Sequence, residues 1–307
     1  MNWPPVLWRV LVALLTLLVA SLIVFFSLNL IPGDPALSLL GVGASPSAVA
    51  QLREQLGLNL PPLSRYLAWL AGVWRGNLGE SIRYSQPVTQ LLGGRLPFTL
   101  ALTTLSLLLT TSLALGLGIL AARREGGALD LALRTFLTLL SAIPSFWLGL
   151  LLILVFAVRY QLLPSTGYNG PRDLILPILT LVLVRVSLPT RMVRSSLLGV
   201  LGSDYVRTAR AKGLSERRVL LRHGLRNALI PLLTVLGLEF AELLTGSVIV
   251  ENVFALPGLG TLALSAISAR DFPLVQGVVL LLAGFVVAVN LLVDLAYTLA
   301  DPRVRYG

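Results

Sequence analysis

Four stretches of this chain run for more than 20 residues without a charged side chain, and they constrain the fold more than any other feature. They cover residues 10–31, 98–122, 135–158 and 272–293. A helix rises about 1.5 Å per residue, so about 20 apolar residues cross the hydrocarbon layer of a membrane. Two further apolar stretches carry charge: residues 174–190 contain Arg185, and residues 227–250 contain Glu239 and Glu242. We therefore predict an all-α membrane protein with six transmembrane helices.

The composition also favours a lipid environment. Hydrophobic residues make up 56% of the 307 residues and charged residues 12%, against about 25% charged residues in soluble proteins. A net charge of +10 often indicates nucleic-acid binding, but one lysine in so apolar a chain fits lipid better, and no nucleic-acid partner is predicted. Without cysteine and with one histidine, His223, the chain offers no thiolate metal site, and no metal is predicted.

The distribution of Lys and Arg predicts the orientation of the spans, because positively charged loops stay in the cytoplasm. With the N-terminus inside, the inner segments carry 15 basic residues, whereas the short outer loops carry three, Arg159, Arg172 and Arg270. We therefore predict that both termini are cytoplasmic. The first apolar run is longer than the core of a signal peptide, which indicates an uncleaved anchor.

These spans divide the chain into three predicted parts: residues 1–31 with the first span, an extracytoplasmic segment 32–97, and a core of five spans in residues 98–307. The extracytoplasmic segment has the pattern of two short helices, at residues 48–56 and 63–74. Trp69 and Trp74 in the second helix are typical of an anchor at the membrane surface. A docking surface for a binding protein is the alternative.

The inner loop 191–226 is the most informative segment, with nine basic and two acidic residues. Ser203 and Asp204 are typical of a helix start, and Gly213 of the left-handed position that ends a helix. A second helix is expected to begin at Glu216. This succession of helix start, helix end and second helix start indicates a folded hairpin and not a passive linker.

On the first helix of this hairpin, Val206, Ala209 and Gly213 share one face, and Leu214 follows at the corner. The pattern predicts an apolar knuckle that projects from a basic hairpin and fits a groove in a partner. The simpler alternative is that the arginines only set the topology and bind anionic lipid headgroups.

Ionisable residues inside the predicted spans are the candidates for a translocation path, because charges in hydrocarbon need a partner or a water-filled cavity. Glu239 and Glu242 share one helix face, and Asn290 and Asp294 are predicted to meet Arg185. These residues either line an aqueous path or fix the packing of one subunit against another. Close helix packing is the expected role of six glycines at positions 116, 118, 237, 246, 277 and 284.

The chain has no Gly-rich phosphate loop of the Walker type, so ATP hydrolysis is not expected here. Residues 204–215, DYVRTARAKGLS, and 222–231, RHGLRNALIP, resemble the coupling loop of ABC-importer permeases, in particular the dipeptide and oligopeptide branch. Segments at residues 95–100, 250–260, 270–273 and 301–306 fit the same branch, so the resemblance covers nearly the whole chain. The wider family opens this loop with Glu where this chain has Arg207, and that departure is typical of the peptide branch.

The resemblance implies a type I ABC importer permease fold in a bacterial or archaeal cytoplasmic membrane, with the loop seated in a cleft of a cytoplasmic ATPase subunit. It also implies a second homologous permease subunit, two ATPase subunits that use ATP and Mg²⁺, and an external solute-binding protein. The chain itself would hold no cofactor. The coupling-loop residues that the resemblance assigns are Tyr205, Val206, Arg207, Ala209, Lys212, Gly213, Leu214 and Ser215.

The function implied is passage of di- or oligopeptides, and the same architecture also imports nickel chelates or glutathione. A different class, an ion-coupled secondary transporter, would use Glu239 and Glu242 for protons. It leaves the basic loop unexplained, and six spans without an evident inverted repeat do not favour it. An enzyme is not predicted, because no catalytic dyad or metal-ligand set is evident.

Overall fold

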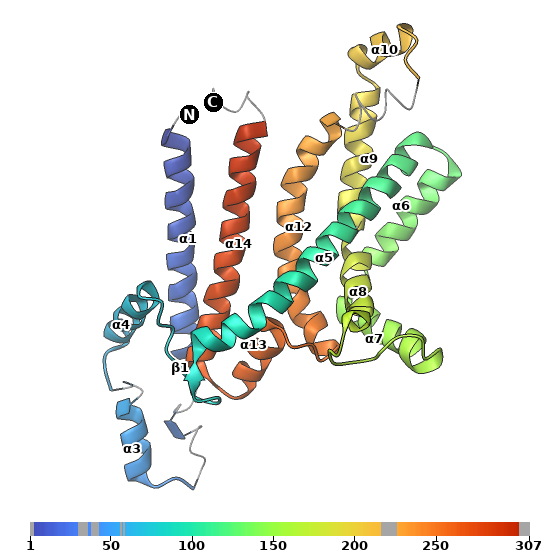
Figure 1. Ribbon diagram of the computed structural model, residues 1–307. Helices are drawn as coiled ribbons and strands as arrows, with labels where there is room; N and C mark the ends of the chain where they lie inside the picture. Colours follow the sequence, from blue (N-terminus) through green and yellow to red (C-terminus); the bar gives the residue numbers. More distant parts are fainter. Residues whose placement is uncertain are drawn as a thin grey trace. The chain divides into compact units, whose positions relative to one another are not determined.

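The computed structural model describes residues 3–29, 36–37, 43–55, 57, 59–215 and 226–300. In these ranges the regular secondary structure is helical except for one short pair of strands (Figure 1). It divides into two compact units: the first contains Met1–Val6, Thr99–Leu256 and Ala288–Gly307, and the second contains Leu7–Phe98 and Pro257–Val287. Two long helices, α5 (Val88–Arg123) and α14 (Phe272–Ala300), contribute to both units.

Three of the described helices are each long and apolar enough to cross a membrane. They are Leu7–Ser27 within α1 (Trp3–Asn29), Val88–Arg123, and Phe272–Leu295 within α14. Two bent helix pairs pass the same test, Ala128–Ser141 with Ser145–Arg159 and Pro171–Arg185 with Ser187–Leu201. The described residues therefore hold three candidate spans, or up to five if each bent pair is one span.

The apolar run at residues 135–158, predicted as one span, is not a single straight helix in the structure. α6 (Ala128–Ser141) ends before Pro144, and α7 (Ser145–Leu152) begins after it and continues as the π-helix η1 (Ile153–Arg159). The two parts are bent by 100°. Proline lacks an N–H and disfavours the helical conformation of the residue before it, so the helix stops although the composition stays apolar.

The first unit is built around α12 (Arg226–Val253), which packs against α7, α8 (Ile175–Arg185) and α9 (Ser187–Leu201). The short 3₁₀-helix η2 (Pro171–Leu174) leads into α8. One apolar cluster of this unit contains Ala122, Val193, Leu197 and Leu232, and another contains Ala114, Leu137 and Val186. These clusters join helices that lie far apart in the sequence.

The second unit contains α3 (Pro46–Gln55), α4 (Pro62–Trp74) and α13 (Leu259–Ser268). Its hairpin pairs β1 (Glu80–Ser81) antiparallel with β2 (Gln86–Pro87). The two short helices predicted between the first and second spans are confirmed, and Gly57 has the positive φ of 64° that a helix-ending glycine adopts. The core of the unit includes Val88, Leu92, Leu259, Leu274 and Val278.

An aromatic cluster attaches α4 to the end of α1 in the second unit. The hydroxyl groups of Tyr66 and Ser21 lie 2.9 Å apart, and the Phe25 ring lies 5.4 Å from Tyr66 and 5.7 Å from Trp69, centroid to centroid. Trp69 therefore packs inside the unit. Trp74 is 78% exposed, so of the two tryptophans it is the one that fits a surface role.

Three of the six glycines occupy close helix contacts in the described structure. A Cβ added at Gly118 would lie 2.6 Å from Val193, one at Gly277 would lie 2.5 Å from Val88, and one at Gly237 would overlap Val293. A Cβ added at Gly246 would make an ordinary van der Waals contact, and among the described residues one at Gly116 or Gly284 would meet nothing within 4 Å. The close-packing prediction is thus confirmed at Gly118, Gly237 and Gly277, whereas Gly116 and Gly284 contact no neighbouring helix among the described residues.

Gly116 and Gly118 form a matched pair for testing this packing, because they lie on the same helix. We expect Gly118→Ala to lower the free energy of unfolding by about 1–3 kcal/mol, since the added methyl group overpacks against Val193. Gly116→Ala should instead be neutral or stabilising by up to about 1 kcal/mol, the helix-propensity gain. Thermal unfolding of the detergent-solubilised transporter measures both, and equal shifts for the two variants would contradict the contact.

Candidate functional site

The candidate coupling helix is α10 (Asp204–Ala211), which follows α9 after Gly202 and Ser203. Ser203 has the extended backbone of an N-cap residue, with φ −75° and ψ 153°, but its hydroxyl donates to the Val200 carbonyl oxygen and does not cap the helix. Gly213 has a φ of +79°. The predicted start and the left-handed glycine stop are therefore confirmed, while the predicted second helix from Glu216 lies outside the described residues.

The apolar knuckle does not project as predicted. Val206 is fully buried and packs against Val200, Leu201 and Leu214, so the apolar side of α10 faces the chain's own α9. The reason is local: with only two residues between α9 and α10, the short helix folds back and buries its valine on the nearest apolar surface. The side chains of Tyr205 and Ala209 lie outside the described set.

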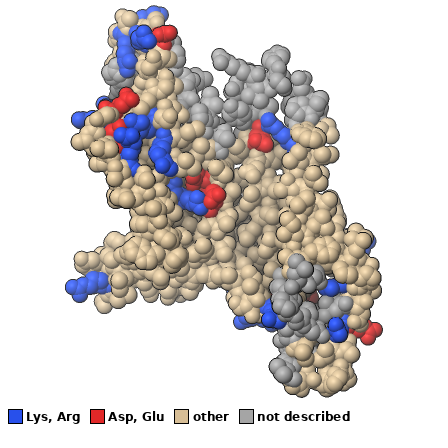
Figure 2. All heavy atoms as spheres, turned by 180° about the vertical axis from the view of Figure 1, so that it is seen from behind, with Lys and Arg blue, Asp and Glu red and all other residues tan. Residues whose placement is uncertain are grey.

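The surface that α10 exposes is polar and basic. Arg207 and Lys212 are exposed, as are Gly213 and Ser215, and Leu214 is half-buried. Arg207 lies 3.1 Å from Asp204, but both side chains are largely exposed, and such pairs contribute little stability. Figure 2 shows basic and acidic side chains gathered on α10 and at the neighbouring end of the first unit. A partner at this site would meet positive charge on a rigidly seated helix.

The candidate path residues fall into different environments. Arg185 donates to Glu242 at 2.7 Å, where the sequence predicts Asn290 or Asp294 as its partner. Asn290 and Asp294 are exposed on α14. Glu239 is 1% exposed and its Oε2 atom has no hydrogen-bond partner among the described residues, whereas the Glu242 side chain is 49% exposed. Glu239 and Glu242 are three residues apart in α12 and so share one helix face, but they differ in burial, and Arg185 contacts Glu242.

Two buried polar contacts involve residues of the segments that carry the family resemblance. The Thr99 hydroxyl donates to Glu251 at 2.7 Å, and both residues are fully buried. The buried Asp271 accepts hydrogen bonds from the Ser81 hydroxyl and from the backbone N–H groups of Arg83 and Leu274. The sequence shows each partner but not the pairing, since the residues are far apart along the chain.

In a third polar contact, Asp130 on α6 meets Arg194 on α9. Neither residue was among the predicted site residues. Arg194 donates from Nε and Nη2 to the two carboxylate oxygens, each at 2.7 Å, and Asp130 is fully buried. A lone acid after two glycines and before a long apolar helix is the only signal in the sequence, and it is typical of any helix start. Within the described ranges, no three acidic or histidine side chains gather as metal ligands would.

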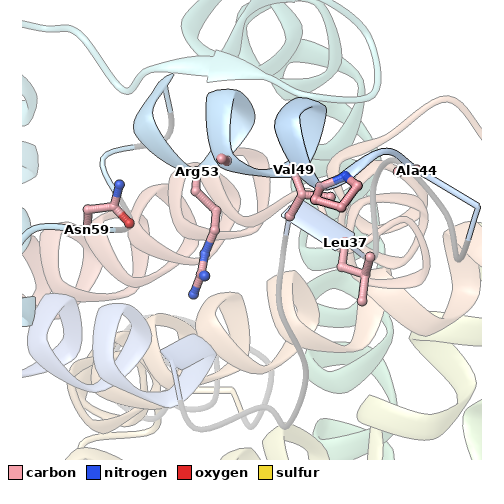
Figure 3. Close-up of a pocket in the computed structure, with 7 residues that line it drawn as sticks. Leu37, Ala44, Val49, Arg53 and Asn59 are labelled. Atoms are coloured by element: carbon pink, nitrogen blue, oxygen red, sulfur yellow. The ribbon is translucent and has the colours of Figure 1, made fainter.

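The second unit holds a hollow of about 400 Å³ beside α3 (Figure 3). Its lining is mostly apolar, and the Arg53 side chain extends from α3 into it. The candidate path residues all belong to the first unit.

Comparison with known proteins identifies the class. Residues 114–306 match the family described as the binding-protein-dependent transport system inner membrane component, and residues 5–103 match the N-terminal model of the same system. The chain belongs to this family of multi-pass, non-catalytic inner-membrane permease subunits.

Two curated relatives match along nearly the full length of the chain. A Brucella abortus protein named as a peptide transport system permease is 43% identical over 98% of both chains. The glutathione transport system permease GsiC of Salmonella choleraesuis is 40% identical over 98% of both. Among solved structures, the inward-facing MetNI methionine ABC transporter matches with a TM-score of 0.59 at 21% identity, over 69% of this chain and 97% of that one, which supports the fold alone.

Proposed function

We propose that this chain is one half of the translocation path of an ABC importer, which carries peptides delivered by an external solute-binding protein. The observation that carries the proposal is the seated α10 with its exposed basic face, on a chain that belongs to the binding-protein-dependent permease family. A second homologous permease would complete the path, and two ATPase subunits would supply the energy from ATP and Mg²⁺.

The proposed topology has six spans, with α12 as a span beside the five candidates, and both termini in the cytoplasm. The bias of Lys and Arg toward the inner segments supports it. In this topology α10 is cytoplasmic, and the hairpin of β1 and β2, with α3 and α4, is extracytoplasmic. Residues 1–31, 32–97 and 98–307 would then form the first-span, outer and core parts.

In this assignment α10 enters a cleft of an ATPase subunit and offers Arg207 and Lys212 to it. The buried Val206 supports this role, because it holds the helix on α9 and so allows a force on α10 to reach the membrane helices. Gly213, Leu214 and Ser215 form the corner that ends the helix. Among the path candidates, the pair of the half-buried Arg185 and the exposed Glu242 favours a polar surface, whereas the buried Glu239 favours a packing role.

Reversing the charge of the α10 surface tests the proposal. We expect Arg207→Glu with Lys212→Glu to reduce co-purification of the ATPase subunits with the permease about tenfold, an effect of about 1.4 kcal/mol. Arg172→Glu, a reversal at an exposed arginine of a predicted outer loop, is the matched control and should leave co-purification unchanged. Equal ATPase recovery from all three proteins would contradict the assigned face.

The substrate class is proposed from the relatives, whose names include peptide and glutathione systems. Labelled dipeptides, oligopeptides, glutathione and a nickel chelate, each offered to the partner binding protein, distinguish the possibilities, and peptide binding is expected. Uptake that needs no ATPase subunit and stops with an ionophore would support the ion-coupled alternative and overturn the importer assignment.

A further inference from the structure

Asp130 is the centre of a charged joint inside the first unit. Its carboxylate is fully buried and receives the two-pronged guanidinium of Arg194, with both nitrogen–oxygen distances at 2.7 Å. The backbone N–H of Gly126 donates to the same carboxylate at 3.1 Å, and Arg134 Nε lies 3.4 Å from it. The single carboxylate therefore holds three separate positively polarised groups.

The joint connects three segments of the chain. Gly126 lies in the turn between α5 and α6, Asp130 and Arg134 lie on the first turns of α6, and Arg194 lies in the middle of α9. A bidentate pair between arginine and carboxylate restricts both the distance and the relative rotation of its two partners. Apolar contacts lack such directionality. At this point α6 cannot slide or turn on α9 without breaking the pair.

The same α9 carries α10 at its end. The Ser203 N–H donates to the Val200 carbonyl oxygen at 3.1 Å, Arg210 Nη1 donates to the Leu201 carbonyl oxygen at 3.3 Å, and Val206 is buried on the end of α9. A displacement of α10 is therefore passed to α9. α6, on the other side of the joint, leads through the sharp bend at Pro144 to α7, which packs on α12 and α8.

We propose that Asp130 and Arg194 form the joint that transmits movement of α10 to α6 and α7 during ATP-driven transport, so that Asp130 is a positioning residue for coupling. This rests on the proposed function, in which α10 contacts an ATPase subunit. Because Asp130 is fully buried, we expect it to contact neither the ATPase nor the substrate. Its loss should leave ATPase binding in place and separate ATP hydrolysis from uptake.

The test uses the full transporter in proteoliposomes, with the permease pair, the ATPase subunits and the binding protein. ATPase recovery, ATP hydrolysis and peptide uptake are measured for each variant. For Asp130→Asn we expect normal ATPase recovery, hydrolysis within about twofold of the parent, and a fall in uptake per ATP of about fivefold or more, the usual lower range of a coupling effect. Arg194→Lys keeps the charge but loses the fork and should show a smaller fall. Glu125→Gln, an exposed acid in the same turn, is the matched control and should match the parent.

A rescue experiment distinguishes a loss of coupling from a loss of overall stability. The chain contains no cysteine, so a variant with Asp130→Cys and Arg194→Cys can be linked by a short bifunctional thiol reagent that spans the length of the lost pair. Uptake per ATP should be low before linking and recover after it, while each single cysteine variant should not recover.

Two results would overturn the proposal that this joint transmits movement. One is unchanged uptake per ATP in Asp130→Asn. The other is a parallel fall of hydrolysis and uptake in every joint variant, without recovery after linking. If Asp130→Asn does not fold, the proposal is tested by the uptake per ATP of Arg194→Lys and of the linked double cysteine variant. If the parent permease recovers no ATPase subunit, the proposed function fails instead, which is a distinct result.

Discussion

Gly213→Val is expected to reduce uptake per ATP hydrolysed about fivefold or more, because it destabilises the corner that ends α10. Gly213 has a φ of +79°, a conformation that costs a residue with a Cβ about 1–2 kcal/mol, and a β-branched residue more. Among the described residues, a Cβ at Gly213 would meet nothing within 4 Å, so the expected cost is that of the backbone conformation. The measurement is the ratio of peptide uptake to ATP hydrolysis in proteoliposomes.

Two other substitutions control for this effect. Gly199→Val places valine at a glycine of α9 that also has open space around it but a negative φ, and it should leave the ratio unchanged. Gly213→Asn should retain most coupling, because asparagine tolerates the left-handed region better than other residues with a side chain. A Gly213→Val transporter that couples as well as Gly213→Asn would show that the left-handed corner is unimportant.

Asp271→Ala is expected to detach the hairpin of β1 and β2 from the start of α14. The alanine cannot accept the hydrogen bonds from Ser81, Arg83 and Leu274 that Asp271 receives in the buried interior of the second unit. Each buried donor left without a partner costs about 1–3 kcal/mol. Hydrogen exchange at the backbone amides of Arg83 and Leu274 should accelerate strongly, which mass spectrometry of the purified transporter measures.

Ser81→Ala is the matched control, because it removes one of these three donors and leaves the acceptor in place. It should accelerate exchange at Arg83 much less than Asp271→Ala does. Slow exchange at both amides in Asp271→Ala would show that the carboxylate does not hold the hairpin.

Local features of the fold were predictable because they depend on neighbouring residues. The runs at 98–122 and 272–293 lie within long apolar helices, and residues 10–29 of the first run lie in α1, since an uncharged stretch of that length has few alternatives in a membrane. Gly57 and Gly213 end helices with positive φ values, since glycine alone adopts that conformation without cost. The family resemblance was also readable, because its motifs are contiguous.

The site was only partly predictable. The sequence identifies α10 and its ends, but it places Val206 outward, whereas the structure buries it on α9. It also proposes Asn290 or Asp294 for Arg185, whereas the structure supplies Glu242. Helical periodicity tells which residues share a face and not what that face contacts.

The sequence by itself thus determined the membrane environment, the long apolar helices and the ends of α10, because apolar length, charge and glycine act locally. Only the tertiary structure decided which partner each buried carboxylate has. Asp130 and Arg194 are 64 residues apart, and Ser81 and Asp271 are 190 apart. Such pairs form where packed helices bring a buried carboxylate to a donor, since a buried charge is stable only with its partner.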